Sequence, residues 1–133
     1  FFGEIGATAK ALAAAERSEL KAIGQRLGSA LEAWIKATEW LGASARSDLA
    51  GVLAAAVPYL HLAVTVCGGW MMGRAAFAAA AKLAAGEGDA RFYASKIATA
   101  RFYADQLLPQ AAAYGETVQA GNAALGAVSD DLF

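Results

Sequence analysis

Apolar residues recur at every seventh position along most of the chain, which is the spacing of one face of an α-helix. In the first segment this row consists of Leu20, Leu27, Trp34 and Leu41, and charged side chains fall mostly outside it. The pattern predicts one helix over residues 3–43. Ser18 is a good N-cap residue, so the alternative is two helices that break near residue 17.

The second segment predicts a helix over residues 48–85. Its main row is Val52, Tyr59, Val66, Gly73 and Ala80, and a neighbouring row of Leu53, Leu60 and Cys67 widens the apolar face. Ser47 is expected to cap the start of the helix, followed by Asp48 as an acid that the helix dipole favours, and Gly86 is expected to end it. Pro58 is expected to kink it, because proline lacks a backbone N–H and clashes with the preceding turn.

The third segment predicts a helix over residues 89–121, with Asp89 as its N-cap. Its apolar positions are Tyr93, Ile97, Ala100, Ala104, Leu107, Ala111, Tyr114 and Val118. Pro109 again predicts a bend. The helix is expected to fray near Gly121 and Asn122, and the tail to Phe133 to be loosely held.

The turns between these segments are short, and short connections make successive helices antiparallel neighbours. The fold class expected is therefore all-α, an up-down bundle of three long antiparallel helices, or four if the first breaks near residue 17. We expect residues 1–133 to form a single helical domain. The opening Phe1-Phe2-Gly3-Glu4 resembles a point inside a longer protein, so a fragment of a longer chain is expected.

Composition narrows the function classes. Hydrophobic residues make up 58% of the 133 residues and charged residues only 17%, which excludes global disorder. The net charge is −1, so no nucleic-acid partner is expected. A single cysteine allows neither an intrachain disulfide nor a cysteine-based zinc site, and a reducing, cytoplasmic location is the default.

Residues 49–73 carry no Asp, Glu, Lys or Arg, and a run of about 25 residues is long enough to cross a bilayer. Gly69 and Gly73 form a GxxxG pair, which is typical of closely packed membrane helices. The run is rich in alanine, however, and the two flanking helices each need an apolar partner. We therefore interpret it as a buried bundle helix and keep peripheral membrane contact as an alternative.

No catalytic, cofactor-binding or metal-ligating residue is assigned from the sequence. His61 has no carboxylate or second histidine one turn away, and Cys67 has apolar neighbours, so both are interpreted as packing residues. The aromatic and basic residues that are candidates for an interface with a partner are Trp34, Trp40, Trp70, Arg74, Arg91 and Arg101.

Several stretches resemble one family module. Residues 68–76, 82–84, 92–104 and 107–109 are similar to the extra C-terminal helical domain of bacterial acyl-CoA dehydrogenases of the methylmercaptopropionyl-CoA dehydrogenase type. The resemblance covers roughly residues 5–125. It implies a parent enzyme that uses FAD and a glutamate base to oxidise an acyl-CoA to a 2-enoyl-CoA.

In that family the FAD contacts and the base belong mainly to the preceding domains, so no cofactor is expected in this fragment and no glutamate is assigned. The resemblance implies a packing or oligomerisation module that contacts the catalytic domains and is inactive alone. Such a module is expected to form a homo-oligomer, with a dimer that buries part of the Trp-bearing surface. The alternatives are a membrane-associated helical module and a free-standing protein-interaction dimer.

Overall fold

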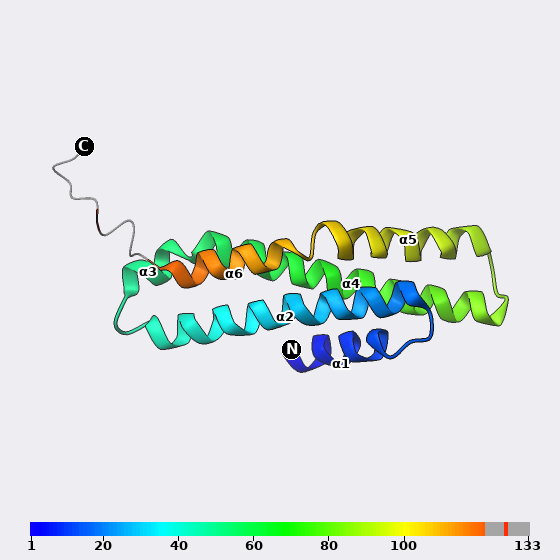
Figure 1. Cartoon of the computed structure of the whole chain (residues 1–133), viewed down its shortest axis with the longest axis horizontal. Coiled ribbons are helices and arrows are strands. Elements are labelled where there is room, and N and C mark those ends of the chain that lie inside the picture. The colour runs from blue at the N-terminus through cyan, green and yellow to red at the C-terminus, as the bar shows by residue number, and fades with distance from the viewer. Residues whose placement is uncertain (122–126, 128–133) are drawn as a thin grey trace.

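The structure, a computed structural model, describes residues 1–121 and residue 127. This part of the chain forms six helices and no strand. The helices are α1 (Phe2–Ala13), α2 (Ser18–Ser44), α3 (Leu49–Ala54), α4 (Ala56–Ala85), α5 (Ala90–Gln106) and α6 (Gln110–Ala120). Figure 1 shows an elongated antiparallel bundle in which α2, α4 with α3, and α5 with α6 run side by side. The predicted all-α up-down class is confirmed, in its version with a broken first helix.

Each of the three predicted long helices is interrupted once, so the boundaries 3–43, 48–85 and 89–121 need correction. Proline explains two of the interruptions. The ring of Pro58 would clash with the carbonyl four residues earlier, at Ala54, and α3 ends at that residue. α5 ends at Gln106, three residues ahead of Pro109, and α6 begins directly after the proline. The interruption ahead of Pro58 is the single residue Ala55, which keeps right-handed helical dihedral angles, whereas residues 107–109 separate α5 from α6.

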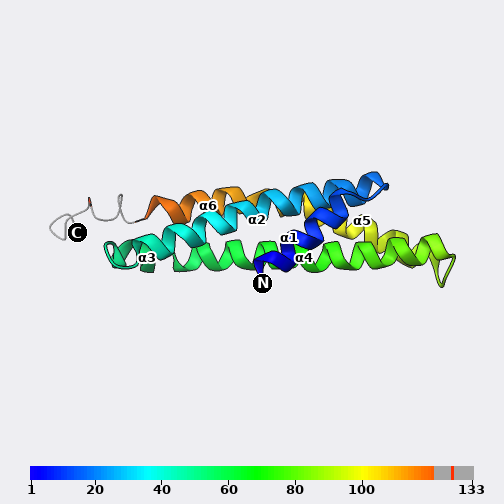
Figure 2. The same cartoon turned by 90° about the horizontal axis from the view of Figure 1, so that it is seen from below.

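The first interruption contains neither proline nor glycine. Residues 14–17 separate α1 from α2, and α1 folds back along α2 (Figure 2). The backbones meet closely at Gly24, where a Cβ atom would lie 2.6 Å from the carbonyl oxygen of Ala9 and 2.8 Å from the carbonyl carbon of Leu12. This close approach lets α1 bury Ile5, Ala9 and Leu12. The tertiary contact, rather than a helix-breaking residue, sets the break.

The predicted caps Asp89 and Gly86 are confirmed, whereas the helix predicted to start at Ser47 is capped by Asp48 instead. The side chain of Asp48 accepts a hydrogen bond from the backbone N–H of Gly51 (2.8 Å), and that of Asp89 accepts one from Arg91 (2.8 Å). Gly86 ends α4 in the left-handed conformation, with φ of 67°. Ser18 is a correction, because the N-cap of α2 is Arg17 and no side chain bonds there. The predicted fraying at Asn122 and the tail lie outside the described residues.

The core is one apolar seam that runs the length of the bundle. Its largest fully buried side chains are Ile5, Leu12, Ile23, Leu27, Leu62, Val66, Leu108 and Val118. The GxxxG pair of α4 is used inside this seam: Gly69 faces Leu108, and Gly73 faces Leu12. Close helix approach in this chain therefore serves the bundle itself.

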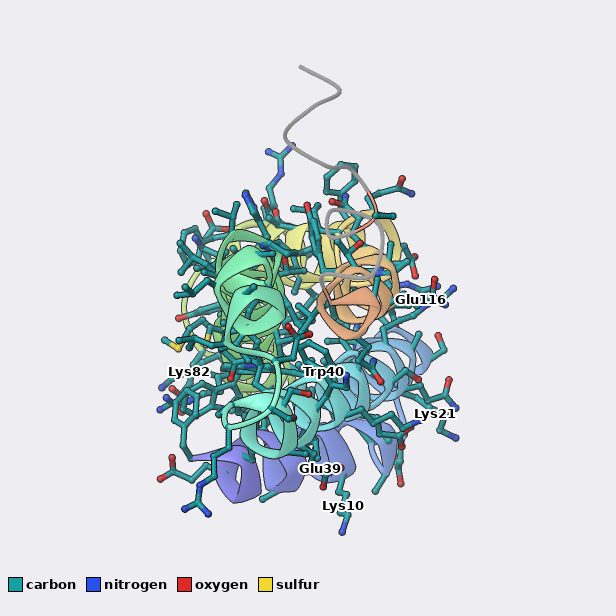
Figure 3. All side chains as sticks on the ribbon, turned by 90° about the vertical axis from the view of Figure 1, so that its left-hand side faces the viewer. Lys10, Lys21, Glu39, Trp40, Lys82 and Glu116 are labelled. Atoms are coloured by element: carbon teal, nitrogen blue, oxygen red, sulfur yellow. The ribbon has the colours of Figure 1, made fainter. Side chains whose placement is uncertain are left out.

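The expected burial of α4 needs correction. The helix was expected to be buried on all sides, but only the face that bears Leu62, Val66, Gly69, Gly73 and Ala76 is buried. Leu53 and Leu60, which were expected to widen the buried face, are 67% and 61% exposed. Figure 3 looks along the bundle and shows α3 and α4 at one edge of it. An apolar face of this helix is thus left uncovered.

Candidate interaction surfaces

The uncovered face of α3 and α4 is a continuous row, which we name the α3–α4 stripe. Its exposed members are Leu49, Leu53, Val57, Leu60, Val64 and Met71, and the half-buried Cys67 completes the row. The six exposed side chains show between 54% and 67% of their area to solvent. Monomeric soluble proteins rarely expose such a contiguous apolar patch, and one usually marks a contact with another molecule.

Near the N-terminus an aromatic cluster joins α1, α2 and α4. The ring of Phe1 meets Trp34 and Trp70 edge-on at centroid distances of 5.9 and 5.6 Å, and Phe2 meets Trp34 at 4.9 Å. The indole N–H of Trp70 donates to the hydroxyl of Thr8 (2.9 Å). The chain's own first residues therefore cover Trp34, of which only 6% is exposed.

The six predicted interface residues do not gather in one place. Trp34 and Trp70 share the aromatic cluster, and the guanidinium of Arg74 lies 5.3 Å from the centre of the Trp70 ring. Trp40 lies towards the other end of α2, nearer α3 and the end of α6 (Figure 3).

Arg91 begins α5 at the far end of the bundle and is exposed. Arg101, also on α5, forms a salt bridge with Asp105 (2.6 Å). Their interface role stays a prediction, and the structure supports a different surface more strongly.

Tyr103 and Cys67 are titratable side chains at the contact between α4 and α5. The hydroxyl of Tyr103 donates to the backbone carbonyl of Thr65 (3.0 Å), and Gly68 makes room for its ring. Burial raises the pKa of Tyr103, and the Cys67 thiolate adds to that rise. Burial also raises the pKa of Cys67, which keeps the thiol protonated and weakly nucleophilic. His61 is exposed, and its ring stacks on that of Tyr114 with the ring centres 5.4 Å apart. It therefore packs at the surface of the bundle and not in its core.

Tyr103→Phe should lower the free energy of unfolding by about 1 kcal/mol at neutral pH, the usual value of one hydrogen bond. The raised pKa of Tyr103 means that the folded protein favours the neutral phenol. Its stabilising effect is complete below the pKa of the unfolded chain, near 10, and is lost as the pH rises through the folded pKa. The gap between wild type and variant should therefore narrow above pH 10 in urea titrations. A gap that widened there would contradict the assignment.

An open groove between α1 and α2 has a volume of about 430 Å³. Its lining combines glycine, alanine, Leu31 and Ile35 with polar side chains, of which Lys10 is the one cation and Glu32 the one anion. Binding the pyrophosphate of FAD calls for a helix N-terminus or a group of cations. This lining offers neither, so these residues do not fit FAD. Within the described residues, moreover, no three His, Cys, Asp or Glu side chains come together as metal ligands would.

By length and composition, α4 is also able to cross a membrane, although core helices of soluble proteins pass the same test. The uncharged run was interpreted as a buried bundle helix, with peripheral membrane contact kept as the alternative. The missed signal is that apolar residues and glycines follow two opposite faces of α3 and α4, as positions 62, 66, 69 and 73 and positions 53, 57, 60 and 64 show. Two such faces are typical of a helix that packs on both sides.

Fold and surface together define a class: a helical bundle module whose distinctive feature is an apolar face left open, not a pocket. Comparison with known families agrees. The family described as "Acetyl-CoA dehydrogenase C-terminal like" matches residues 1–129. The chain therefore belongs to this family of C-terminal acyl-CoA dehydrogenase domains, which confirms the resemblance seen in the sequence.

A named relative narrows the comparison. The chain is 41% identical over 108 residues to a 3-methylmercaptopropionyl-CoA dehydrogenase of Ruegeria pomeroyi. The matched region is 81% of this chain but only 17% of that protein. The chain thus spans a small part of the relative's length.

Proposed function

We propose that this chain is the C-terminal helical packing and oligomerisation module of an FAD-dependent acyl-CoA dehydrogenase, and that it supplies no catalytic group. The parent enzyme oxidises an acyl-CoA to a 2-enoyl-CoA in the cytoplasm. The observation that carries the oligomerisation role is the α3–α4 stripe, an apolar face that the bundle leaves open. The family match supports the identity of the parent.

The placement of charged groups also supports a packing role. A general acid or base works from a positioned side chain within reach of a bound substrate. Among the described residues the buried side chains of the bundle are apolar, and the carboxylates that form ion pairs, such as Asp105 with Arg101 and Glu19 with Arg17, lie at the surface. The module's partners are then the catalytic domains of the parent chain and other copies of the enzyme.

Removing this module from the parent enzyme should lower its melting temperature or change its assembly, while the flavin absorbance of the remaining domains is retained. The isolated chain, mixed with FAD and an acyl-CoA, should show no bound-flavin absorbance and no reduction of an electron-accepting dye. Loss of all flavin on removal, or dye reduction by the isolated chain, would contradict the proposal. Light scattering and absorbance at the flavin bands measure both effects.

A second candidate is a membrane-associated module, favoured by the length and apolar composition of α4. In that case the chain should float with liposomes in a density gradient. Full recovery in the lipid-free fraction, for vesicles with and without anionic lipid, would exclude it.

A further inference from the structure

We propose that the α3–α4 stripe is a homotypic interface, on which the same stripe of a second copy packs in the antiparallel direction. This inference rests on the oligomerisation role proposed above and names the surface that performs it. From the sequence, a dimer was expected to form through the surface that bears the tryptophans. Phe1 and Phe2 already cover much of that surface, so the open stripe is the better candidate.

The spacing of the stripe is that of a coiled-coil seam. From Leu53 onward its members stand at positions 53, 57, 60, 64, 67 and 71, so steps of four and three alternate, and Leu49 precedes them by one further step of four. This is the a/d repeat with which one helix packs knobs into holes on another. From position 49 to 71 the stripe is about 33 Å long, at 1.5 Å per residue. Its natural occupant is therefore a helix of similar length and apolar character.

The stripe is complementary to itself. In an antiparallel pair, a positions face d positions of the other helix. Centred between residues 60 and 64, this register places Leu60 against Val64 of the second copy, and Val57 against Cys67 of the second copy. Leu53 then meets Met71 of the second copy. Each pair combines side chains of different shape, and the contact closes on itself by a two-fold axis, as isologous dimers do.

Charge decides between the two directions of pairing. Between Leu49 and Gly73 there is no charged side chain, so charges flank the seam only at its ends. Arg46 and Asp48 precede it and Arg74, which is exposed, follows it. A parallel pair would place Arg74 against Arg74 of the second copy. The antiparallel pair instead places Arg74 opposite Ala50 of the second copy, beside the turn that carries both Arg46 and Asp48, so the two Arg74 side chains no longer face each other and each lies near a carboxylate.

The same charge pattern disfavours a lipid surface as the occupant. Helices that lie on a bilayer carry Lys and Arg along the edges of their apolar face, where they meet anionic headgroups. Between residues 50 and 73 the side chains beside this stripe include alanine, threonine, glycine, Tyr59, His61 and Trp70, but no Lys or Arg. A helix from a second copy satisfies both the apolar row and its uncharged borders.

The register can be tested by disulfide formation in the 133-residue chain. Val57→Cys places a thiol opposite Cys67 of the second copy, so a mild added oxidant should convert most of the protein into a covalent dimer. Leu49→Cys is the matched control, because positions 49 and 57 are both 63% exposed but position 49 lies about 12 Å along the helix from that cysteine. It should cross-link much less. Wild-type protein should stay uncrosslinked, whereas a parallel pair would link Cys67 to Cys67.

Sedimentation equilibrium tests the surface independently of its register. Leu60→Glu should convert a dimer to a monomer, and adding Val64→Lys to it should restore the dimer through two pairs across the axis. Phe102→Glu is the control: Phe102 is 63% exposed against 61% for Leu60, but it lies on α5 outside the stripe. It should leave the dimer unchanged. Circular dichroism confirms that each variant stays helical.

A monomeric wild type, or a dimer insensitive to Leu60→Glu, overturns the homotypic interface. So does equal cross-linking of the two cysteine variants, and so does binding of wild type, but not of Leu60→Glu, to liposomes. None of these outcomes bears on the flavin absorbance or melting temperature of the parent enzyme with and without the module. Failure of this inference is therefore distinguishable from failure of the proposed function.

Discussion

Gly24→Ala is expected to lower the free energy of unfolding by about 3 kcal/mol, the upper part of the range for overpacking. The added Cβ would meet backbone atoms of α1, at 2.6 Å from the Ala9 oxygen and 2.8 Å from the Leu12 carbon. Backbone cannot rotate aside as a flexible side chain can, so α1 must move away from α2. Urea unfolding followed by circular dichroism measures the loss.

Gly28→Ala is the matched control, one turn further along the same helix. A Cβ atom there meets nothing within 4 Å. Alanine in a helix interior is more favourable than glycine, so this variant should gain about 0.5–1 kcal/mol. If the two substitutions shift stability in the same direction, α1 does not lie against Gly24.

Leu62→Ala is expected to cost about 2–5 kcal/mol, as deletion of a buried leucine side chain usually does. Leu62 is 0% exposed and lies in the central seam of the bundle. Leu60→Ala, two residues away but 61% exposed, should change the free energy of unfolding by no more than about 0.5 kcal/mol. Both are measured by urea unfolding at low protein concentration, where a dimer does not contribute. Equal costs would mean that α4 is buried on both faces within one chain.

The local signals in the sequence predicted much of this fold. Asp89 caps a helix because its short carboxylate reaches free backbone N–H groups, and Gly86 ends one because it adopts positive φ without strain. The start of α3 was predicted to within one residue, with Asp48 taking the capping place expected of Ser47. The break between α1 and α2 was less predictable. The break depends on the close contact of Gly24 in α2 with Ala9 and Leu12 in α1. The periodic pattern of apolar residues does not predict such a contact.

The open surface was harder to predict than the fold. An uncharged helix with two apolar faces has the same sequence whether its second face meets its own bundle or another molecule. Only the three-dimensional placement of α5, α6 and α1 shows that Leu53 and Leu60 are left uncovered. Similarly, no sequence motif predicts that the ring of Phe1 contacts both Trp34 and Trp70 edge-on.

The hairpin of α1 and α2 and the hairpin of α4 and α5 have a consequence for how this chain forms. In each hairpin the two helices follow one another along the chain, with only a short turn between them. Helical bundles, in which most contacts join residues close along the chain, cross their folding barrier within microseconds to milliseconds. Tertiary structure should therefore be complete before two molecules meet, and the encounter between them, rather than chain collapse, sets the pace of assembly at low concentration.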